Sequence, residues 1–186
     1  MTKTICILLA DGFEEAEALV PADYLARLGF NIKFVGTADT KVRGTHNFYL
    51  HTDTTLDNIT PDNLDALILP GGLPGTLNLR NDERVINLVK QAHAKNKICA
   101  AICAAPIILR DSQIANDLTI TGYPECEKLS FNPNFKFSGN AVESNGQIIT
   151  AIGMGQAASF AFAIAKALGT SEEHLASLAL STFTNI

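Results

Sequence analysis

The stretch KICAAICAAPIIL, residues 97–109, changes its pattern halfway along and thereby indicates the fold. Residues 98–102 form a continuous apolar run, which is typical of a strand buried on both faces of a parallel sheet. Residues 104–110 read instead as a short helix, with Pro106 in the first turn, where its missing N–H costs nothing. The stretch therefore predicts a strand that passes through Cys103 directly into a helix, as in an α/β protein.

The rest of the chain repeats this alternation. Strands are expected at residues 4–10, 31–35, 66–69, 98–102 and 147–151, and helices at residues 14–28, 83–94, 104–110, 156–168 and 171–180. This order predicts βαβ units, and so a mostly parallel sheet with helices on both faces. Residues 41–53 are expected to form a hairpin or an added edge strand, and residues 140–149 a hairpin around Asn145-Gly146. We expect one domain over residues 1–186.

The composition argues against several classes of protein. The 186-residue chain has a formal net charge of −5 and no stripe of lysine or arginine, so nucleic acid is an unlikely partner. The first apolar run is too short to span a membrane and lacks a cleavage pattern, and we expect a cytoplasmic protein with no membrane partner. The cysteines and histidines show neither disulfide nor metal-ligand spacing, which predicts free thiols and no metal site.

The two cysteines of the opening stretch occupy different kinds of position. Cys99 lies inside a strand, as does Cys6, and both are expected to be core residues. Cys103 stands at the strand-to-helix turn, the position of a nucleophile elbow, where the helix N-terminus would stabilise a thiolate. Backbone amides there and in the Gly71-Gly72 turn could bind an oxyanion. The pattern alone leaves a reactive thiol and a structural thiol open for Cys103.

Glu17 is the second unusual residue. It shares the apolar stripe of its predicted helix with Val20, Tyr24 and Leu28. A carboxyl group on a buried face must find a partner or stay protonated. Such a group could donate a hydrogen bond to a thiolate or serve as a general acid/base, but a snorkelling or capping glutamate also fits. Pro21 is expected to kink or shorten the helix.

Four motifs together resemble the ThiJ/PfpI superfamily, in the branch of the parkinsonism-associated protein deglycase and bacterial YajL. They are ADGFEEAE (residues 10–17), LPGG (69–72), AICAAP (101–106) and GMG (153–155). The resemblance implies a flavodoxin-like three-layer sandwich, a homodimer and cofactor-free chemistry. It also implies that Cys103 is a low-pKa nucleophile that oxidises to sulfinate and that Glu17 is a protonated partner of its sulfur. The amides of Gly72 and Ala104 would form the oxyanion pocket.

The sequence departs from the family pattern at several pocket positions. Tyr123 stands where the animal branch has a histidine, so proton transfer is expected to fall on Glu17, with Tyr123 as a second candidate. His46 replaces an arginine that lines the pocket across the family dimer, and Arg27 fits the partner position of that arginine. Ala104, directly after the cysteine, disfavours the peptidase activity of the PfpI branches, which have a histidine there.

Two functions are expected from these residues. The first is a cysteine-dependent stress-response enzyme of the glyoxalase III or deglycase type, which acts on a small aldehyde or dicarbonyl such as methylglyoxal. The alternative is an oxidative-stress sensor or redox-regulated chaperone in which Cys103 is oxidised to sulfinate. Cys126 could act as a resolving thiol, although nothing in its spacing requires it. A binding domain with an inert thiol is the third, least favoured interpretation.

Overall fold

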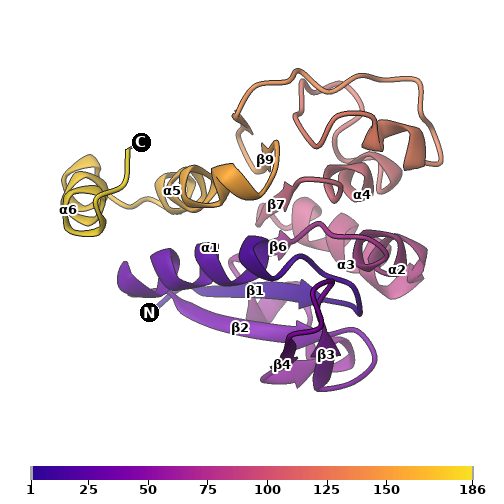
Figure 1. Ribbon diagram of the computed structural model, residues 1–186, viewed down its shortest axis with the longest axis horizontal. Helices are drawn as coiled ribbons and strands as arrows, with labels where there is room; N and C mark the ends of the chain where they lie inside the picture. Colours follow the sequence, from indigo (N-terminus) through magenta and orange to yellow (C-terminus); the bar gives the residue numbers. More distant parts are fainter. Residues whose placement is uncertain (1, 186) are drawn as a thin grey trace.

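A seven-stranded sheet in the order β5-β2-β1-β6-β7-β9-β8 forms the centre of the molecule (Figure 1). The computed structural model describes residues 2–185. The strands of this sheet are β1 (Thr4–Leu9), β2 (Asn31–Gly36), β5 (Thr54–Thr55), β6 (Ala66–Leu69), β7 (Ile98–Ile102), β8 (Val142–Asn145) and β9 (Ile148–Ala151). Every neighbouring pair is parallel except β8 and β9. The predicted mostly parallel sheet is therefore confirmed.

The central strands are the apolar runs that the sequence indicated. All residues of β6, β7 and β9 are buried, as are Ile5–Leu9 of β1. Continuous apolar runs of this kind fit strands that are covered on both faces. Because these strands are parallel, their carboxyl ends meet at one edge of the sheet, where α/β proteins place their ligands.

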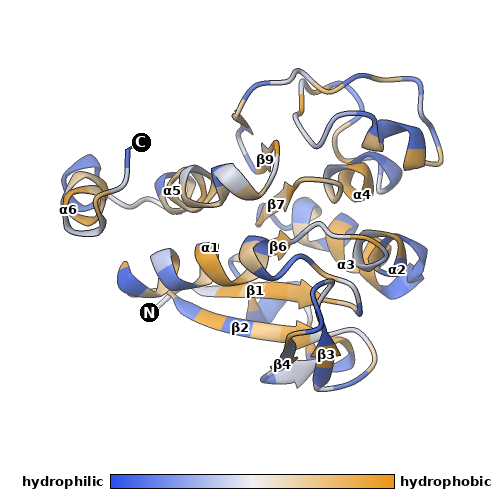
Figure 2. Ribbon diagram, viewed as in Figure 1, coloured by the Kyte–Doolittle hydropathy of each residue, from blue (hydrophilic) through white to orange (hydrophobic). Residues whose placement is uncertain are grey.

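Helices cover both faces of the sheet, which gives the predicted three layers. The helices are α1 (Glu15–Arg27), α2 (Gly75–Asn81), α3 (Glu83–Ala94), α4 (Pro106–Asp111), α5 (Ala157–Ala167) and α6 (Glu172–Thr182). Alternate residues of β1 divide between the two cores: Ile5, Ile7 and Leu9 pack with α1, α5 and α6, whereas Cys6 and Leu8 pack with α2, α3 and α4. Figure 2 shows the apolar strands between these helices.

Both predicted hairpins are present. Strands β8 and β9 are joined by Asn145-Gly146, where Gly146 has the positive φ of 63° that a tight turn of this kind requires. Strands β3 (Lys41–Arg43) and β4 (Tyr49–His51) form a separate two-stranded sheet rather than an added edge strand of the main sheet. Its loop approaches the first turn of α1, because Phe13 and Gly44 form an isolated bridge.

Three local details differ from the expectations. The helix expected from Ala104 begins at Pro106, since residues 103–105 form the turn itself. Pro21 does not shorten α1, which continues to Arg27, although a proline cannot donate to the Glu17 carbonyl one turn earlier. Helix α2 was not expected, because it is only about two turns long and starts in the glycine-rich turn after β6.

None of the helices between residues 2 and 185 is both long enough and apolar enough to cross a membrane.

Candidate active site

Cys103 lies at the sharp turn between β7 and α4, as predicted. Its φ of 63° is in the left-handed region, which costs a residue with a side chain about 1–2 kcal/mol. Two backbone hydrogen bonds hold this conformation. The Cys103 amide donates to the carbonyl of Ala151 at 2.9 Å, and its carbonyl accepts from the amide of Tyr123 at 2.7 Å. The strained turn points the thiol out of the sheet edge and is typical of a functional site.

Glu17 meets Cys103 from the neighbouring helix. Its side chain is 1% exposed, and its Oε2 accepts a hydrogen bond from the amide of Gly71 at 2.9 Å. The carboxyl group of Glu17 also lies beside Cys103, because Oε2 of Glu17 and Cβ of Cys103 would both lie 2.7 Å from a Cβ on Gly71. The acidic residue on the apolar stripe of α1 is therefore paired with the thiol rather than snorkelling or capping.

Burial raises the pKa of Glu17 to about 7, against the combined effect of hydrogen bonds from Cys103, Gly71 and the Met154 backbone, which lower it. A carboxyl group with this pKa keeps its proton through mildly acidic pH and releases it near neutrality. It can thus act as an acid or as a base within the pH range of the cell.

The electrostatics of Cys103 differ from the expectation of a low-pKa thiol. Burial raises the pKa of Cys103, and the Glu17 carboxylate raises it further, whereas the Ala104 amide lowers it. The helix N-terminus does not overcome these effects, because α4 starts only at Pro106. In the resting site the thiol therefore keeps its proton, and the ionised Glu17 is the group placed to take it.

Gly71 brings the two functional side chains together. A Cβ atom on Gly71 would lie 2.7 Å from Cβ of Cys103, 2.7 Å from Oε2 of Glu17 and 3.1 Å from the amide nitrogen of Ala104. Real Cβ atoms do not approach other heavy atoms this closely, so only glycine fits between the elbow and the carboxyl group. The sequence analysis predicted an oxyanion-binding role for the Gly71-Gly72 turn and assigned it to the amide of Gly72, but it did not predict this packing role of Gly71.

The two residues predicted to supply oxyanion amides lie in two different turns. Ala104 follows Cys103, and its amide hydrogen-bonds to the sulfur, which lowers the pKa of Cys103. Gly72, with φ of 88°, forms the turn after β6 and packs against the backbone of Gly12 and Phe13. Both amides thus belong to the turns that flank Cys103.

Tyr123 lies at the rim of the site. Its amide is bonded to the Cys103 carbonyl, its ring lies within 3.7 Å of where a Cβ of Gly153 would be, and its side chain is 55% exposed. The turn that contains Gly153 reaches the site as well, through the Met154 backbone that contacts Glu17. The structure therefore brings Tyr123 to the site, where its phenol faces solvent.

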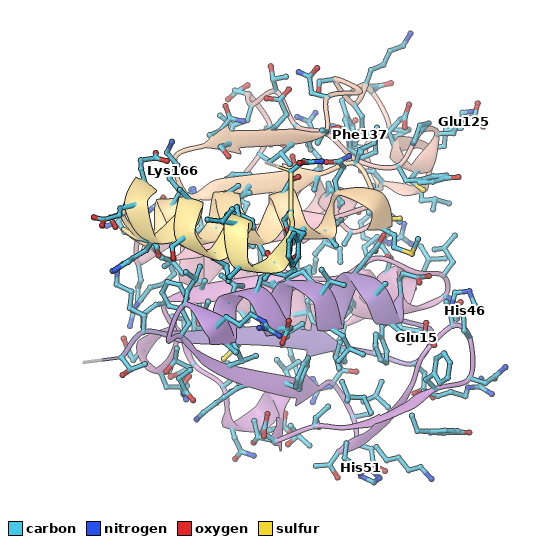
Figure 3. The ribbon with its side chains drawn as sticks, turned by 60° about the vertical axis from the view of Figure 1, so that its left-hand side comes forward. Glu15, His46, His51, Glu125, Phe137 and Lys166 are labelled. Carbon is cyan, nitrogen blue, oxygen red and sulfur yellow. The ribbon has the colours of Figure 1, made fainter. Side chains whose placement is uncertain are left out.

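His46 and Arg27 do not join this group within the chain. Nδ1 of His46 lies 2.9 Å from Oε2 of Glu15 and 3.7 Å from Oε1 of Glu14. Figure 3 shows Glu15 and His46 side by side at the start of α1. Arg27 lies at the opposite end of α1 and pairs with Asp23 at 2.8 Å. The pocket role that the family resemblance implies for these two residues concerns a dimer interface.

The pairing of Glu15 with His46 was missed by sequence reasoning. Glu15 lies in the first turn of α1, where an acidic residue is an ordinary complement to the helix dipole, and its histidine partner is 31 residues further along the chain. The hydrogen bonds from His46 outweigh burial and lower the pKa of Glu15. Among residues 2–185, Glu14, Glu15 and His46 are the one group of three whose potential metal-ligand atoms lie within 4.8 Å of one another. Gly44 was the residue of the sequence that could have indicated this contact. The structure leaves no room for a side chain there, because a Cβ would lie 2.2 Å from Oε1 of Glu15.

The fold and the cysteine elbow define the class to which this protein is assigned. Residues 3–167 match the DJ-1/PfpI family, and the chain belongs to that family.

Similar proteins support the same assignment. Protein dj-1beta from Drosophila melanogaster is 31% identical over 174 residues, which cover 93% of each chain. The Parkinson disease protein 7 homolog from Danio rerio is 31% identical over 169 residues, 89% of each chain. The crystal structure of Drosophila melanogaster DJ-1beta superposes with a TM-score of 0.88 at 28% identity and covers 100% of both chains. That of the C103A mutant of a DJ-1 superfamily protein, STM1931 from Salmonella typhimurium, gives 0.89 at 27% identity, again over 100% of both chains. The likeness confirms the flavodoxin-like sandwich of the DJ-1 type.

Proposed function

We propose that this protein is a cofactor-independent enzyme of the glyoxalase or deglycase type, in which Cys103 attacks the aldehyde carbon of a small dicarbonyl such as methylglyoxal. The observation that carries the proposal is the buried carboxyl group of Glu17 beside the thiol of Cys103 at a strained elbow. A structural cysteine needs neither a carboxyl partner nor a left-handed backbone.

The pair supplies the groups that the reaction requires. The ionised Glu17 takes the thiol proton as the sulfur bonds to the aldehyde carbon, and the amides of Ala104 and Gly72 bind the oxygen that becomes negative. Glu17 passes the thiol proton on to this oxygen, which gives the neutral hemithioacetal and restores the carboxylate. Glu17 then moves a proton from the first carbon to the adjacent carbonyl carbon through an enediol, while the hydroxyl proton of the first carbon passes to the oxygen of the second, which leaves a thioester of the hydroxy acid. Water then cleaves the thioester, which releases lactate and restores the thiol.

The decisive experiment follows lactate from methylglyoxal without glutathione or added metal. Cys103→Ser is expected to abolish production, whereas Cys99→Ser, in the fully buried strand β7, serves as the matched control and is expected to remain active. Turnover that survives Cys103→Ser would rule out the covalent route. Early glycation adducts on a peptide, offered to the same set of proteins, separate a deglycase from a simple glyoxalase.

A second candidate function is an oxidative-stress sensor or redox-regulated chaperone. The observation that favours it is the same surrounding of the sulfur, since a protonated Glu17 and the Ala104 amide could both donate hydrogen bonds to sulfinate oxygens. Mild peroxide followed by mass analysis should place the added oxygens on Cys103. Oxidation shared equally with the buried Cys99 would contradict a specialised sensor.

The remaining expectations are part of the same proposal. We place the protein in the cytoplasm as a stress-response homodimer with a small aldehyde substrate and without a nucleic acid or membrane partner. Exposed aromatic side chains on the β3–β4 hairpin, Phe48 and Tyr49, are candidates for burial in such a dimer. Light scattering tests the dimer. A PfpI-type peptidase is not proposed, because Ala104 occupies the position of the required histidine.

A further inference from the structure

We propose that Cys126 is the resolving thiol for Cys103: after a peroxide oxidises Cys103 to a sulfenic acid, the two sulfurs form a disulfide within the chain. The proposal rests on the reactive Cys103 described above, but not on the dicarbonyl reaction.

Two backbone hydrogen bonds tie Cys126 to the site. The amide of Tyr123 donates to the carbonyl of Cys103 at 2.7 Å, and the amide of Cys126 donates to the carbonyl of Tyr123 at 3.1 Å. One tight turn therefore separates the two cysteines, although they are distant in sequence. Spacing along the chain could not reveal this, because the contact is made by a loop that returns to the elbow.

Exposure and electrostatics agree with this placement. Cys103 and Cys126 are half-buried, whereas Cys6 and Cys99 are completely buried. Burial is the main cause that raises the pKa of both thiols; the charges of Glu17 and Cys126 raise the pKa of Cys103 further, and those of Glu127 and Glu17 raise the pKa of Cys126 further. Cys103, Cys126 and Glu17 are thus close enough for their charges to interact. A peroxide can also reach the thiols of Cys103 and Cys126 more readily than those of the core.

The loop that carries Cys126 is closed at its base. The amide of Ser138 donates to the carbonyl of Ile120 at 3.0 Å, and the ring of Phe137 packs on Gly122, where a Cβ would lie only 2.6 Å from Cζ. In Figure 3, Phe137 lies near the strands and Glu125 at the outer edge of the molecule. The segment that carries Cys126 is therefore held next to the elbow. Disulfide formation would bring the two Cα atoms to about 4.4–6.8 Å from each other.

The chemistry balances with a peroxide as the oxidant. The Cys103 sulfur attacks the O–O bond, so that an S–O bond forms, the O–O bond breaks, and water or an alcohol leaves. The Cys126 sulfur then attacks the Cys103 sulfur. The S–S bond forms, the S–O bond breaks, and the departing hydroxide takes the Cys126 proton as water. A second peroxide would instead convert the sulfenic acid to the sulfinic acid.

This competition gives the proposal a sharp test. Disulfide formation from the sulfenic acid does not depend on peroxide, whereas sulfinate formation does, so the disulfide should dominate at low peroxide and the sulfinate at high peroxide. Wild type, Cys126→Ser and the control Cys99→Ser are treated with graded hydrogen peroxide, alkylated, digested without reductant and examined by mass spectrometry. We expect a cross-linked Cys103–Cys126 peptide in wild type and Cys99→Ser. In Cys126→Ser it should be absent, and the sulfinate should form at several-fold lower peroxide.

Equal sulfinate yields in wild type and Cys126→Ser at every peroxide concentration, or cross-links found only between two chains on a non-reducing gel, would overturn the proposal. Its failure is distinguishable from failure of the proposed enzyme. Reduced Cys126→Ser is expected to make lactate at the wild-type rate, so a missing disulfide with normal lactate production contradicts only the resolving role. A disulfide without lactate production contradicts only the enzyme.

Discussion

The carboxyl group of Glu17, in the first turn of α1, lies beside the thiol of Cys103 at the end of β7, and each of the two groups shifts the pKa of the other. Hydrogen bonds from other parts of the site stabilise both residues in this arrangement. Burial disfavours the charge on Glu17, and the amide of Gly71 at 2.9 Å partly compensates for it. The left-handed conformation of Cys103 depends on Ala151 and Tyr123. The pair therefore combines a titratable base and a nucleophile at one sheet edge.

Replacing Glu17 by glutamine should remove the base while keeping most of the side-chain volume. We expect Glu17→Gln to reduce kcat for methylglyoxal by about 100-fold or more, the usual contribution of a positioned general base. In wild type kcat/KM should rise as pH increases through about 7, because Glu17 then loses its proton and can accept that of the thiol. The variant should lose this rise. An unchanged pH profile in Glu17→Gln would assign the titration to another group.

The same pKa shift affects stability. Glu17 titrates near 4.5 when unperturbed and at about 7 in the folded protein, so the folded state holds a proton that the unfolded state has released. The free energy of unfolding should therefore fall as pH rises from 4.5 to 7, by about 3 kcal/mol in total, and level off above that range.

Urea unfolding of wild type and Glu17→Gln across this range is the measurement. The glutamine variant should lack this pH-dependent loss, because it carries no charge to desolvate. A loss of equal size in both proteins would mean that other groups cause it.

Much of the fold could be predicted because its elements are defined by local patterns. The buried strands β1, β6 and β7 are continuous apolar runs, and the Asn145-Gly146 turn fixes the hairpin of β8 and β9. Helix α2 was not predicted, because a helix of this length is stabilised by the packing of its buried residues Thr76 and Leu79 and shows no clear periodicity of apolar residues. The start of α4 was placed too early because residues 103–105 share the composition of the helix but form the turn.

The candidate site was predictable in its residues but not in its contacts. Cys103 and Glu17 each depart from the local sequence pattern. Cys103 stands at the turn between a strand and a helix, and Glu17 places a charge on an apolar stripe, and both departures are visible in the sequence. The raised pKa of Cys103 depends on burial and on the Glu17 carboxylate, which a linear pattern cannot quantify. His46, in the β3–β4 loop, contacts Glu15 in α1, and the distance between these two residues along the sequence does not indicate that contact.

Gly71 should tolerate no side chain. In Gly71→Ala the new methyl group would lie 2.7 Å from both Cys103 and Glu17, so the elbow and the carboxyl group must separate. We expect loss of lactate production and of the close approach between the two side chains, with a destabilisation of about 1–3 kcal/mol, typical of overpacking. Lactate assays and urea unfolding measure these effects.

The matched control for this substitution is Gly155→Ala. A Cβ on Gly155 has nothing within 4 Å, and its backbone does not require glycine, so stability and activity are expected to stay at wild-type values. Full activity in Gly71→Ala would show that the close approach at Gly71 is not needed for the reaction.

His46 should titrate as the partner of Glu15. The hydrogen bond to Glu15 is the largest cause that raises the pKa of His46, followed by the charge of Glu14. Since the protonated histidine is favoured in the folded protein, the ion pair stabilises the β3–β4 loop below the ordinary histidine pKa of 6.5 and is lost as pH rises through the raised value. NMR titration of the His46 ring should therefore give a midpoint above 6.5 in wild type and one closer to 6.5 in Glu15→Gln.

The exposed Glu173→Gln in α6 provides the control and should leave the midpoint unchanged. An identical midpoint in all three proteins would mean that the contact at 2.9 Å does not persist in solution.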